Sequence, residues 1–177
     1  GYDSAGIATL ESQDLLRIEK KQGKVANLEA HIGENKPQGT VGIGHTRWAT
    51  HGPPSDVNAH PHAGGQGRIA VIHNGIIENY EALRELLTHR GHNLVSETDT
   101  EVLAHFIEEV QLSTGLDLPD AVRTALKEVV GAYALVVIDQ SHPYRLIAAR
   151  KSSPLVIGVG QDNEFFVGSD ATPIAVS

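Results

Sequence analysis

The amino-acid sequence predicts one domain of the α+β class, in which strands and helices are grouped separately. Strand-like segments occupy both ends of the chain, helical segments lie together between them, and no regular alternation of strand and helix occurs. The 177 residues suffice for one domain with a sizeable core, and 40% of them are hydrophobic, as expected of a globular protein.

The predicted strands are short runs of apolar or alternating residues, bounded by polar or glycine-containing segments. They cover residues 7–10, 15–19, 40–45, 68–73, 132–139, 145–149, 155–159 and 164–168. The first two flank the polar residues 11–14, so together they form a predicted β-hairpin.

The predicted helices carry apolar residues at intervals of three or four. They cover residues 24–32, 79–90, 98–110 and 118–130. Gly91 follows the second helix as a left-handed cap. The sequence Thr-Asp-Thr-Glu at residues 98–101 is a capping box that begins the third helix.

Residues 46–67 form a long segment rich in proline, glycine and histidine between two predicted strands. A loop of this length inside a compact domain is usually functional or disordered. Its histidines and the single tryptophan of the chain, Trp48, favour a function.

Composition narrows the classes of partner. A net charge of −8 argues against nucleic acid, which requires a basic surface. No apolar run approaches the roughly 18 residues of a membrane span, and no signal peptide opens the chain. The absence of cysteine excludes disulfides and thiolate metal sites within these residues and fits a cytoplasmic protein.

Arg47 and Asp99 are a candidate pair for binding an amino acid. Arg47 follows a predicted strand, where a guanidinium can bind a carboxylate through two parallel hydrogen bonds. Taken alone, each residue has a simpler interpretation: a surface salt bridge for Arg47, and a favourable helix-dipole contact for Asp99. Together they match the carboxylate and ammonium groups of an amino acid.

Asn74 and Gly75 follow an apolar strand and permit two interpretations. Asn-Gly is the commonest tight-turn dipeptide, so spacing alone favours a turn. The alternative is an oxyanion hole, in which the carboxamide N–H of Asn74 and the backbone N–H of Gly75 bind a developing negative oxygen.

Histidines are concentrated between residues 45 and 73, where five of the ten lie. A zinc site built from His45, His51 and His60 is one interpretation, but no His-Glu-x-x-His motif accompanies it. Packing or hydrogen bonding within the loop is the default for these side chains. For Trp48, core packing is favoured over a position in a pocket wall.

Four segments in this order resemble the glutaminase domain of glutamine–fructose-6-phosphate aminotransferase, or glucosamine-6-phosphate synthase, a class II glutamine amidotransferase. They are residues 44–52 (Gly-His-Thr-Arg-Trp-Ala-Thr-His-Gly), 58–62 (Asn-Ala-His-Pro-His), 73–79 (His-Asn-Gly-Ile-Ile-Glu-Asn) and 96–101 (Ser-Glu-Thr-Asp-Thr-Glu). Residues 1–6, 152–158 and 169–170 are similar to the same family, so the resemblance covers nearly the whole chain.

The resemblance implies an N-terminal-nucleophile hydrolase fold, an αββα sandwich of two antiparallel sheets between helix layers. In this family an N-terminal cysteine attacks the carboxamide of glutamine, and its own α-amino group acts as the base. The implied partners are L-glutamine, L-glutamate and isomerase domains of the same polypeptide that bind fructose 6-phosphate, in a homo-oligomer. We expect neither a cofactor nor a metal.

The resemblance also assigns roles to individual residues. Arg47 would bind the α-carboxylate of the substrate and Asp99 its α-ammonium, while Asn74 and Gly75 would form the oxyanion hole. The remaining substrate-binding assignments fall in the loop after residue 46: Thr50, His51 and Trp48, the last at the mouth of the path for ammonia.

The chain departs from the family pattern because it contains no cysteine. We expect residues 1–177 to be a type-2 glutamine amidotransferase domain truncated at both ends, without the isomerase domains and inactive alone. Three alternatives stay open: an amidophosphoribosyltransferase-type amidotransferase, a non-catalytic module that binds glutamine or glutamate, and a metal-dependent hydrolase.

Overall fold

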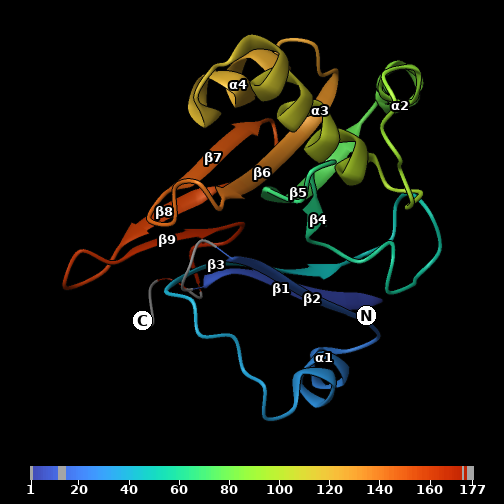
Figure 1. Ribbon diagram of the computed structural model, residues 1–177. Helices are drawn as coiled ribbons and strands as arrows, with labels where there is room; N and C mark the ends of the chain where they lie inside the picture. The colour runs from blue at the N-terminus through green and yellow to red at the C-terminus, as the bar shows by residue number, and fades with distance from the viewer. Residues whose placement is uncertain (1, 12–14, 173, 175–177) are drawn as a thin grey trace.

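Two antiparallel sheets lie face to face in the computed structural model, which describes residues 2–11, 15–172 and 174 (Figure 1). The three-stranded sheet contains, in spatial order, β2 (Leu15–Gln22), β1 (Ser4–Glu11) and β3 (Val41–Arg47). The four-stranded sheet contains β4 (His62–Ala63), β5 (Ile69–Ile77), β6 (Gly131–Asp139) and β7 (Leu146–Lys151). A two-stranded sheet contains β8 (Val156–Val159) and β9 (Phe165–Gly168).

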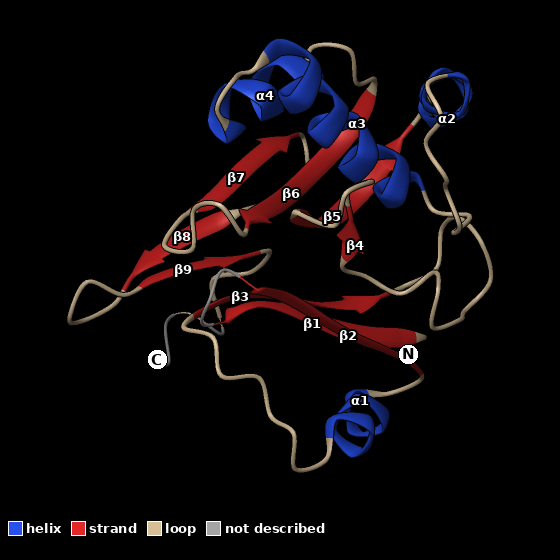
Figure 2. Ribbon diagram, in the orientation of Figure 1, coloured by secondary structure: helices blue, strands red, loops and turns tan. Residues whose placement is uncertain are grey.

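Helices cover the outer faces of the two larger sheets (Figure 2). The helix α1 (Val25–Ile32) lies below the three-stranded sheet. Above the four-stranded sheet lie α2 (Tyr80–His89), α3 (Asp99–Thr114) and α4 (Leu118–Ala125). This arrangement confirms the predicted α+β class and its αββα order of layers.

Strand β5 from Ile69 to His73, and most of its neighbour β6, are largely buried on both faces, and successive side chains enter different cores. In β5, Ile69 and Val71 pack against the helices, whereas Ala70 faces the other sheet. In β6, Val137 packs toward the helices and Ile138 toward the sheet. The alternation explains why both segments read as continuous apolar runs in the sequence.

The core between the sheets is small, and its side chains come from both sides. Ala8 and Ile43 of the three-stranded sheet meet Ala70, Val136 and Ile138 of the four-stranded sheet. The core between the four-stranded sheet and the helices is larger and includes Leu87, Leu103 and Ile107 from the helices. The helix side therefore supplies most of the apolar burial.

The hairpin predicted at the start of the chain is confirmed: β1 and β2 pair antiparallel from Ser4–Gln22 to Glu11–Leu15. Of the polar segment predicted at 11–14, Glu11 belongs to β1 and residues 12–14 lie outside the described residues. Further along, Thr98 caps α3 by accepting a hydrogen bond from the backbone N–H of Glu101 at 3.2 Å, as a capping box requires. The Glu101 carboxylate instead binds the N–H groups of Val95 and Ser96, and so fixes the approach to the helix.

The predicted helix over 118–130 ends earlier than its apolar pattern indicated. Helix α4 stops at Ala125, although Val129 is buried. The chain turns there to enter β6, and Val130 accepts a hydrogen bond from the N–H of Glu78. At Gly131 the backbone has φ 131°, and a Cβ atom would lie 2.1 Å from the carbonyl oxygen of Ile76, so only glycine fits this entry. Apolar spacing persists through 129 because the turn also faces the core.

Within the described ranges, none of the helices has both the length and the apolar character needed to cross a membrane.

Replacing a core leucine of α3 should cost far more stability than replacing an exposed leucine of the same helix. Leu103 is fully buried, whereas Leu112 is 42% exposed. We expect Leu103→Ala to lower the free energy of unfolding by about 2–5 kcal/mol, and Leu112→Ala by roughly 0.5 kcal/mol or less. Urea denaturation measures both changes, and equal losses would contradict the assignment of the core.

Candidate active site

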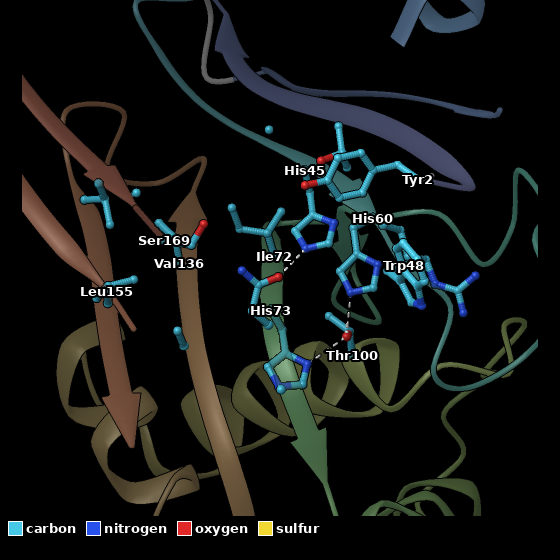
Figure 3. A pocket seen from close by; sticks show the side chains of 18 of the residues that line it. Tyr2, His45, Trp48, His60, Ile72, His73, Thr100, Val136, Leu155 and Ser169 are labelled. Atoms are coloured by element: carbon cyan, nitrogen blue, oxygen red, sulfur yellow. Dashed lines mark hydrogen bonds between the residues drawn. The ribbon is translucent and has the colours of Figure 1, made fainter. Parts of the chain in front are cut away.

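One pocket of about 650 Å³ lies where β3, β5, β6 and β9 come together (Figure 3). It brings together all the residues for which the sequence predicted a role in substrate binding or catalysis: Arg47, Trp48, Thr50, His51, Asn74, Gly75 and Asp99. They come from three elements and a loop that are far apart in the sequence. Their assembly at a single pocket is the central observation about this site.

Asn74 and Gly75 lie inside strand β5, and the expectation of a tight turn is wrong. The strand continues to Ile77, and every residue from 69 to 77 is paired with β6. Pairing over the full strand overrides the local preference of Asn-Gly for a turn. Gly75 has φ 124°, and a Cβ atom would lie 2.0 Å from the carbonyl oxygen of Ala132, so glycine is required where the strand borders the pocket.

Asp99 is the first residue of α3 and is only 3% exposed. Its Oδ2 accepts a hydrogen bond from the backbone N–H of Ile77 at 3.0 Å, which ties the start of α3 to the end of β5. The Thr100 hydroxyl donates to Oδ1 at 3.4 Å. The helix dipole stabilises the carboxylate at this position, and Asp99 lines the pocket.

Arg47 ends β3 and is 3% exposed, so the expectation of a surface salt bridge is wrong. Its guanidinium donates to the carbonyl oxygens of His51, of Gly52 at 3.0 Å and of Pro53 at 3.5 Å. Asp3 lies 3.6 Å from Nη1. Arg47 therefore folds the following loop back over itself at the edge of the pocket, and a bound carboxylate would share its N–H groups with these carbonyls.

The loop after Arg47 is held by side chains that the sequence did not single out. Asp3 Oδ2 accepts a hydrogen bond from the backbone N–H of Ala49 at 2.5 Å, which places the turn that follows β3.

Trp48 is 68% exposed at the pocket, and the expectation of core packing is wrong. Its strand has already ended, so the indole leaves the sheet instead of entering the layer between the sheets.

His51 and Thr50 lie in the same loop and line the pocket. The His51 ring packs edge-on against Tyr80 with ring centroids 4.7 Å apart, and its Nδ1 lies 3.8 Å from Asp99 Oδ2. The loop therefore reaches across the pocket to the start of α3.

A hydrogen-bonded group of histidines surrounds Thr100, a residue that sequence reasoning missed because nothing distinguishes it from other helix-start threonines. His60 Nε2 lies 2.7 Å and His73 Nδ1 lies 3.1 Å from the Thr100 hydroxyl (Figure 3). His62 Nε2 lies 3.1 Å from the hydroxyl of Thr98, two residues before Thr100. These are the hydrogen-bonding histidines expected as the default for this segment.

Within residues 2–11, 15–172 and 174, no group of three or more candidate side chains is arranged to hold a metal ion. Of the three histidines considered for zinc, His45 contacts Asn74 and His60 contacts Thr100, while His51 packs on Tyr80. The rings are thus oriented by neighbouring polar groups of the protein.

Burial keeps this histidine group neutral. Desolvation lowers the pKa of His60 and of His62 well below the ordinary 6.5, and it lowers the pKa of His73 to about 4 against the opposing attraction of Asp99. The pKa of His45 is also lowered, chiefly by burial. At neutral pH each ring therefore has one N–H donor and one acceptor nitrogen.

The depressed histidine pKa values predict acid-sensitive folding. Below about pH 6.5 the unfolded chain takes up protons on these rings, whereas the folded chain does not. The free energy of unfolding is therefore highest above pH 6.5 and falls as the pH drops. For His73 this fall continues to about pH 4. Each ring contributes a slope of up to about 1.4 kcal/mol per pH unit. Urea unfolding at several pH values measures the total slope.

A pair of variants isolates one ring. His62→Gln should reduce the slope between pH 6.5 and 5 by roughly one proton's contribution, because a titrating group is removed from the unfolded chain. His89→Gln, which replaces a ring at an exposed position of α2, is the matched control. An identical slope in the His62 variant would contradict the assignment.

Comparison with known proteins identifies relatives over nearly the whole chain. A glutamine–fructose-6-phosphate aminotransferase (isomerizing) of Bacteroides thetaiotaomicron is 54% identical over 98% of this chain and 28% of its own length. The protein of the same name from Thermus thermophilus is 54% identical over 96% of this chain and 27% of its own length. The chain therefore spans little more than a quarter of these relatives.

A solved structure of glutamine phosphoribosylpyrophosphate amidotransferase from B. subtilis is similar over 99% of this chain and 37% of its own, with a TM-score of 0.82 and 29% identity. A second, described as the allosteric regulatory enzyme of purine biosynthesis, has a TM-score of 0.84 and the same identity and coverage. The family model described as a glutamine amidotransferase domain matches residues 45–175. With this match over most of its length, the chain belongs to the glutamine amidotransferase domain family.

Proposed function

We propose that this chain binds L-glutamine within a longer enzyme that transfers the amide nitrogen of glutamine to fructose 6-phosphate, giving glucosamine 6-phosphate and L-glutamate. The observation that carries the proposal is the single pocket bordered by a buried carboxylate, a buried guanidinium and the Asn74–Gly75 pair. The names of the most similar relatives support the acceptor, because they describe an isomerizing aminotransferase that acts on fructose 6-phosphate.

Asp99 and Arg47 bind the two charged groups of glutamine. The Asp99 carboxylate accepts from the α-ammonium, and burial strengthens this contact because water does not compete for it. Arg47 donates to the α-carboxylate from the edge of the pocket while it holds the carbonyls of the loop. His51 and Thr50 cover the bound amino acid from the same loop, since both line the pocket.

Asn74 and Gly75 bind the oxygen of the carboxamide as it becomes negative. The Asn74 side chain and the Gly75 backbone both supply N–H donors, and glycine at 75 lets β5 lie close to β6, where a Cβ atom would be 2.0 Å from the carbonyl oxygen of Ala132. Loss of one such donor typically lowers kcat by about 100- to 1,000-fold. The donors are fixed on a paired strand, so they need no rearrangement during the reaction.

The attacking thiolate must come from outside these residues, because the chain holds no cysteine. The pocket extends between β3 and β9 over an apolar wall of Ile72, Val136, Leu155 and Val167. Among the described residues, β3 pairs with β1 and β9 pairs with β8, so each has one edge without a partner strand. We place a cysteine-bearing strand of the longer protein along these edges, with its thiol near Asn74.

The proposed reaction then proceeds in two steps. The thiol passes its proton to the α-amino group of the same cysteine, and sulfur attacks the carboxamide carbon. The amide nitrogen of the tetrahedral intermediate then takes up that proton, and the C–N bond breaks to release ammonia and leave a thioester. Water hydrolyses the thioester to glutamate. We infer that the ammonia leaves past Trp48, whose exposed indole lies at the pocket.

The alternative acceptor is a phosphoribosyl group, as in the solved structures that share this fold. Their identity of 29% supports a common domain, whereas 54% identity to the sugar-phosphate enzymes favours fructose 6-phosphate.

On its own, this chain acts as a module that binds glutamine or glutamate without cleaving it. We place the longer protein in the cytoplasm, where reducing conditions fit a chain without cysteine.

Two charge-removing substitutions test the binding roles. Calorimetric titration of this chain with L-glutamate should show about 10- to 100-fold weaker binding for Arg47→Ala and for Asp99→Asn, because each loses a hydrogen bond between charged groups. Asn retains an oxygen acceptor for the N–H of Ile77, so α3 stays docked. The matched controls Arg123→Ala and Asp120→Asn change an exposed ion pair on α4 and should bind like the parent.

Hydrolysis tests the catalytic role. A longer protein that includes the cysteine-bearing segment should release glutamate from glutamine, whereas this chain and a Cys→Ala version of the longer protein should not. Supplying fructose 6-phosphate should yield glucosamine 6-phosphate only with the complete enzyme. Glutamate release by the isolated chain at the rate of the longer protein would refute the nucleophile assignment.

A further inference from the structure

His45 of β3 contacts Asn74 of β5, and this contact connects the two sheets at the pocket. His45 Nε2 lies 2.7 Å from Asn74 Oδ1 (Figure 3). The alternation of β5 places Asn74 on the same face as Ala70 and Ile72, toward the three-stranded sheet, while His73 points to α3. The side chain that would stabilise an oxyanion is therefore oriented from the opposite sheet.

The two nitrogens of His45 have different surroundings. Nε2 meets Asn74, whereas Nδ1 is buried and has no hydrogen-bond partner. A buried N–H without an acceptor is costlier than a buried acceptor without a donor. The neutral ring therefore carries its proton on Nε2 and donates it to Asn74 Oδ1.

This donation decides which end of the Asn74 carboxamide is left for a ligand. With Oδ1 accepting from His45, Nδ2 remains as the donor, and it makes no hydrogen bond to any other described residue. The opposite tautomer would attract Nδ2 to the ring and present Oδ1 to the substrate oxygen. Two facing acceptors would repel, and the oxyanion would lose a donor.

The His45 ring is itself held in place. It stacks on His60 with ring centroids 4.5 Å apart and planes 20° apart, and His60 is fixed through its 2.7 Å contact with Thr100. Thr100 follows Asp99, so the same chain of contacts reaches the carboxylate proposed to bind the ammonium. The ring therefore has little freedom to turn away from Asn74.

We propose that His45 is a positioning residue: its Nε2–H holds the Asn74 carboxamide with the oxygen turned inward and the NH₂ group turned to the oxyanion. The inference rests on the proposed function, because it assigns the donor orientation at that site. His45 does not touch the reacting atoms and acts through Asn74 alone. It therefore affects the transition state more than the binding of glutamine.

Four variants of the longer, cysteine-bearing protein test the proposal. His45→Gln places an amide N–H near the position of Nε2, whereas His45→Asn is polar but too short to reach Asn74. We expect His45→Asn to lower kcat for glutamine hydrolysis by roughly 10- to 100-fold, with KM within about twofold, and His45→Gln to retain most of the rate. In an Asn74→Ala background, His45→Asn should not lower kcat further, because His45 acts on the reaction only through Asn74.

The outcomes separate this proposal from the proposed function. If the parent enzyme hydrolyses glutamine and His45→Asn keeps its kcat, or if the two substitutions multiply their effects, the positioning role is overturned. If the parent releases no glutamate, the proposed function fails. In that case the hydrogen bond between His45 and Asn74 can still be tested in this chain. ¹⁵N NMR should show the His45 proton on Nε2, and a proton on Nδ1 would overturn the inference.

Discussion

The antiparallel pairing of β5 with β6 is the constraint on which the candidate site depends. The nine residues of β5 are paired throughout, and the ladder continues past Asn74 and Gly75 without a turn. Since the strand is straight to its end, the N–H of Ile77 meets the carboxylate of Asp99 at 3.0 Å. One strand therefore carries the proposed oxyanion donors at Asn74 and Gly75 and, at Ile77, the N–H that holds the proposed ammonium receptor Asp99.

Sequence periodicity predicted the elements of the fold because burial has a different period in strands and helices. The β1–β2 hairpin, α2, α3 and the closing strands all lie where apolar spacing placed them. Boundaries were less predictable. Helix α4 ends before the buried Val129, since an apolar side chain in a turn contributes the same pattern as one in a helix.

The site was predictable in its members but not in their contacts. Chemistry and resemblance singled out Arg47, yet nothing in the sequence showed that its guanidinium binds three carbonyls of the loop that follows it. The dipeptide Asn-Gly favours a tight turn, but the long-range pairing of β5 with β6 outweighs this local preference. Thr100 gave no signal, because its importance comes from two histidines that reach it from distant segments.

Strand β3 couples the two functions of the pocket mechanically. His45 and Arg47 are two residues apart on this strand, so both side chains leave the same face and both line the pocket. The His45 ring contacts Asn74 in the opposite sheet, and the Arg47 guanidinium orders the loop that is proposed to cover the amino acid. A displacement of β3 would therefore disturb the oxyanion donor and the loop together, whereas Asp99, which is held by β5 and α3, would keep its place. The proposed oxyanion donor and the loop proposed to cover the amino acid therefore both depend on β3, whereas the proposed receptor for the ammonium is held separately by β5 and α3.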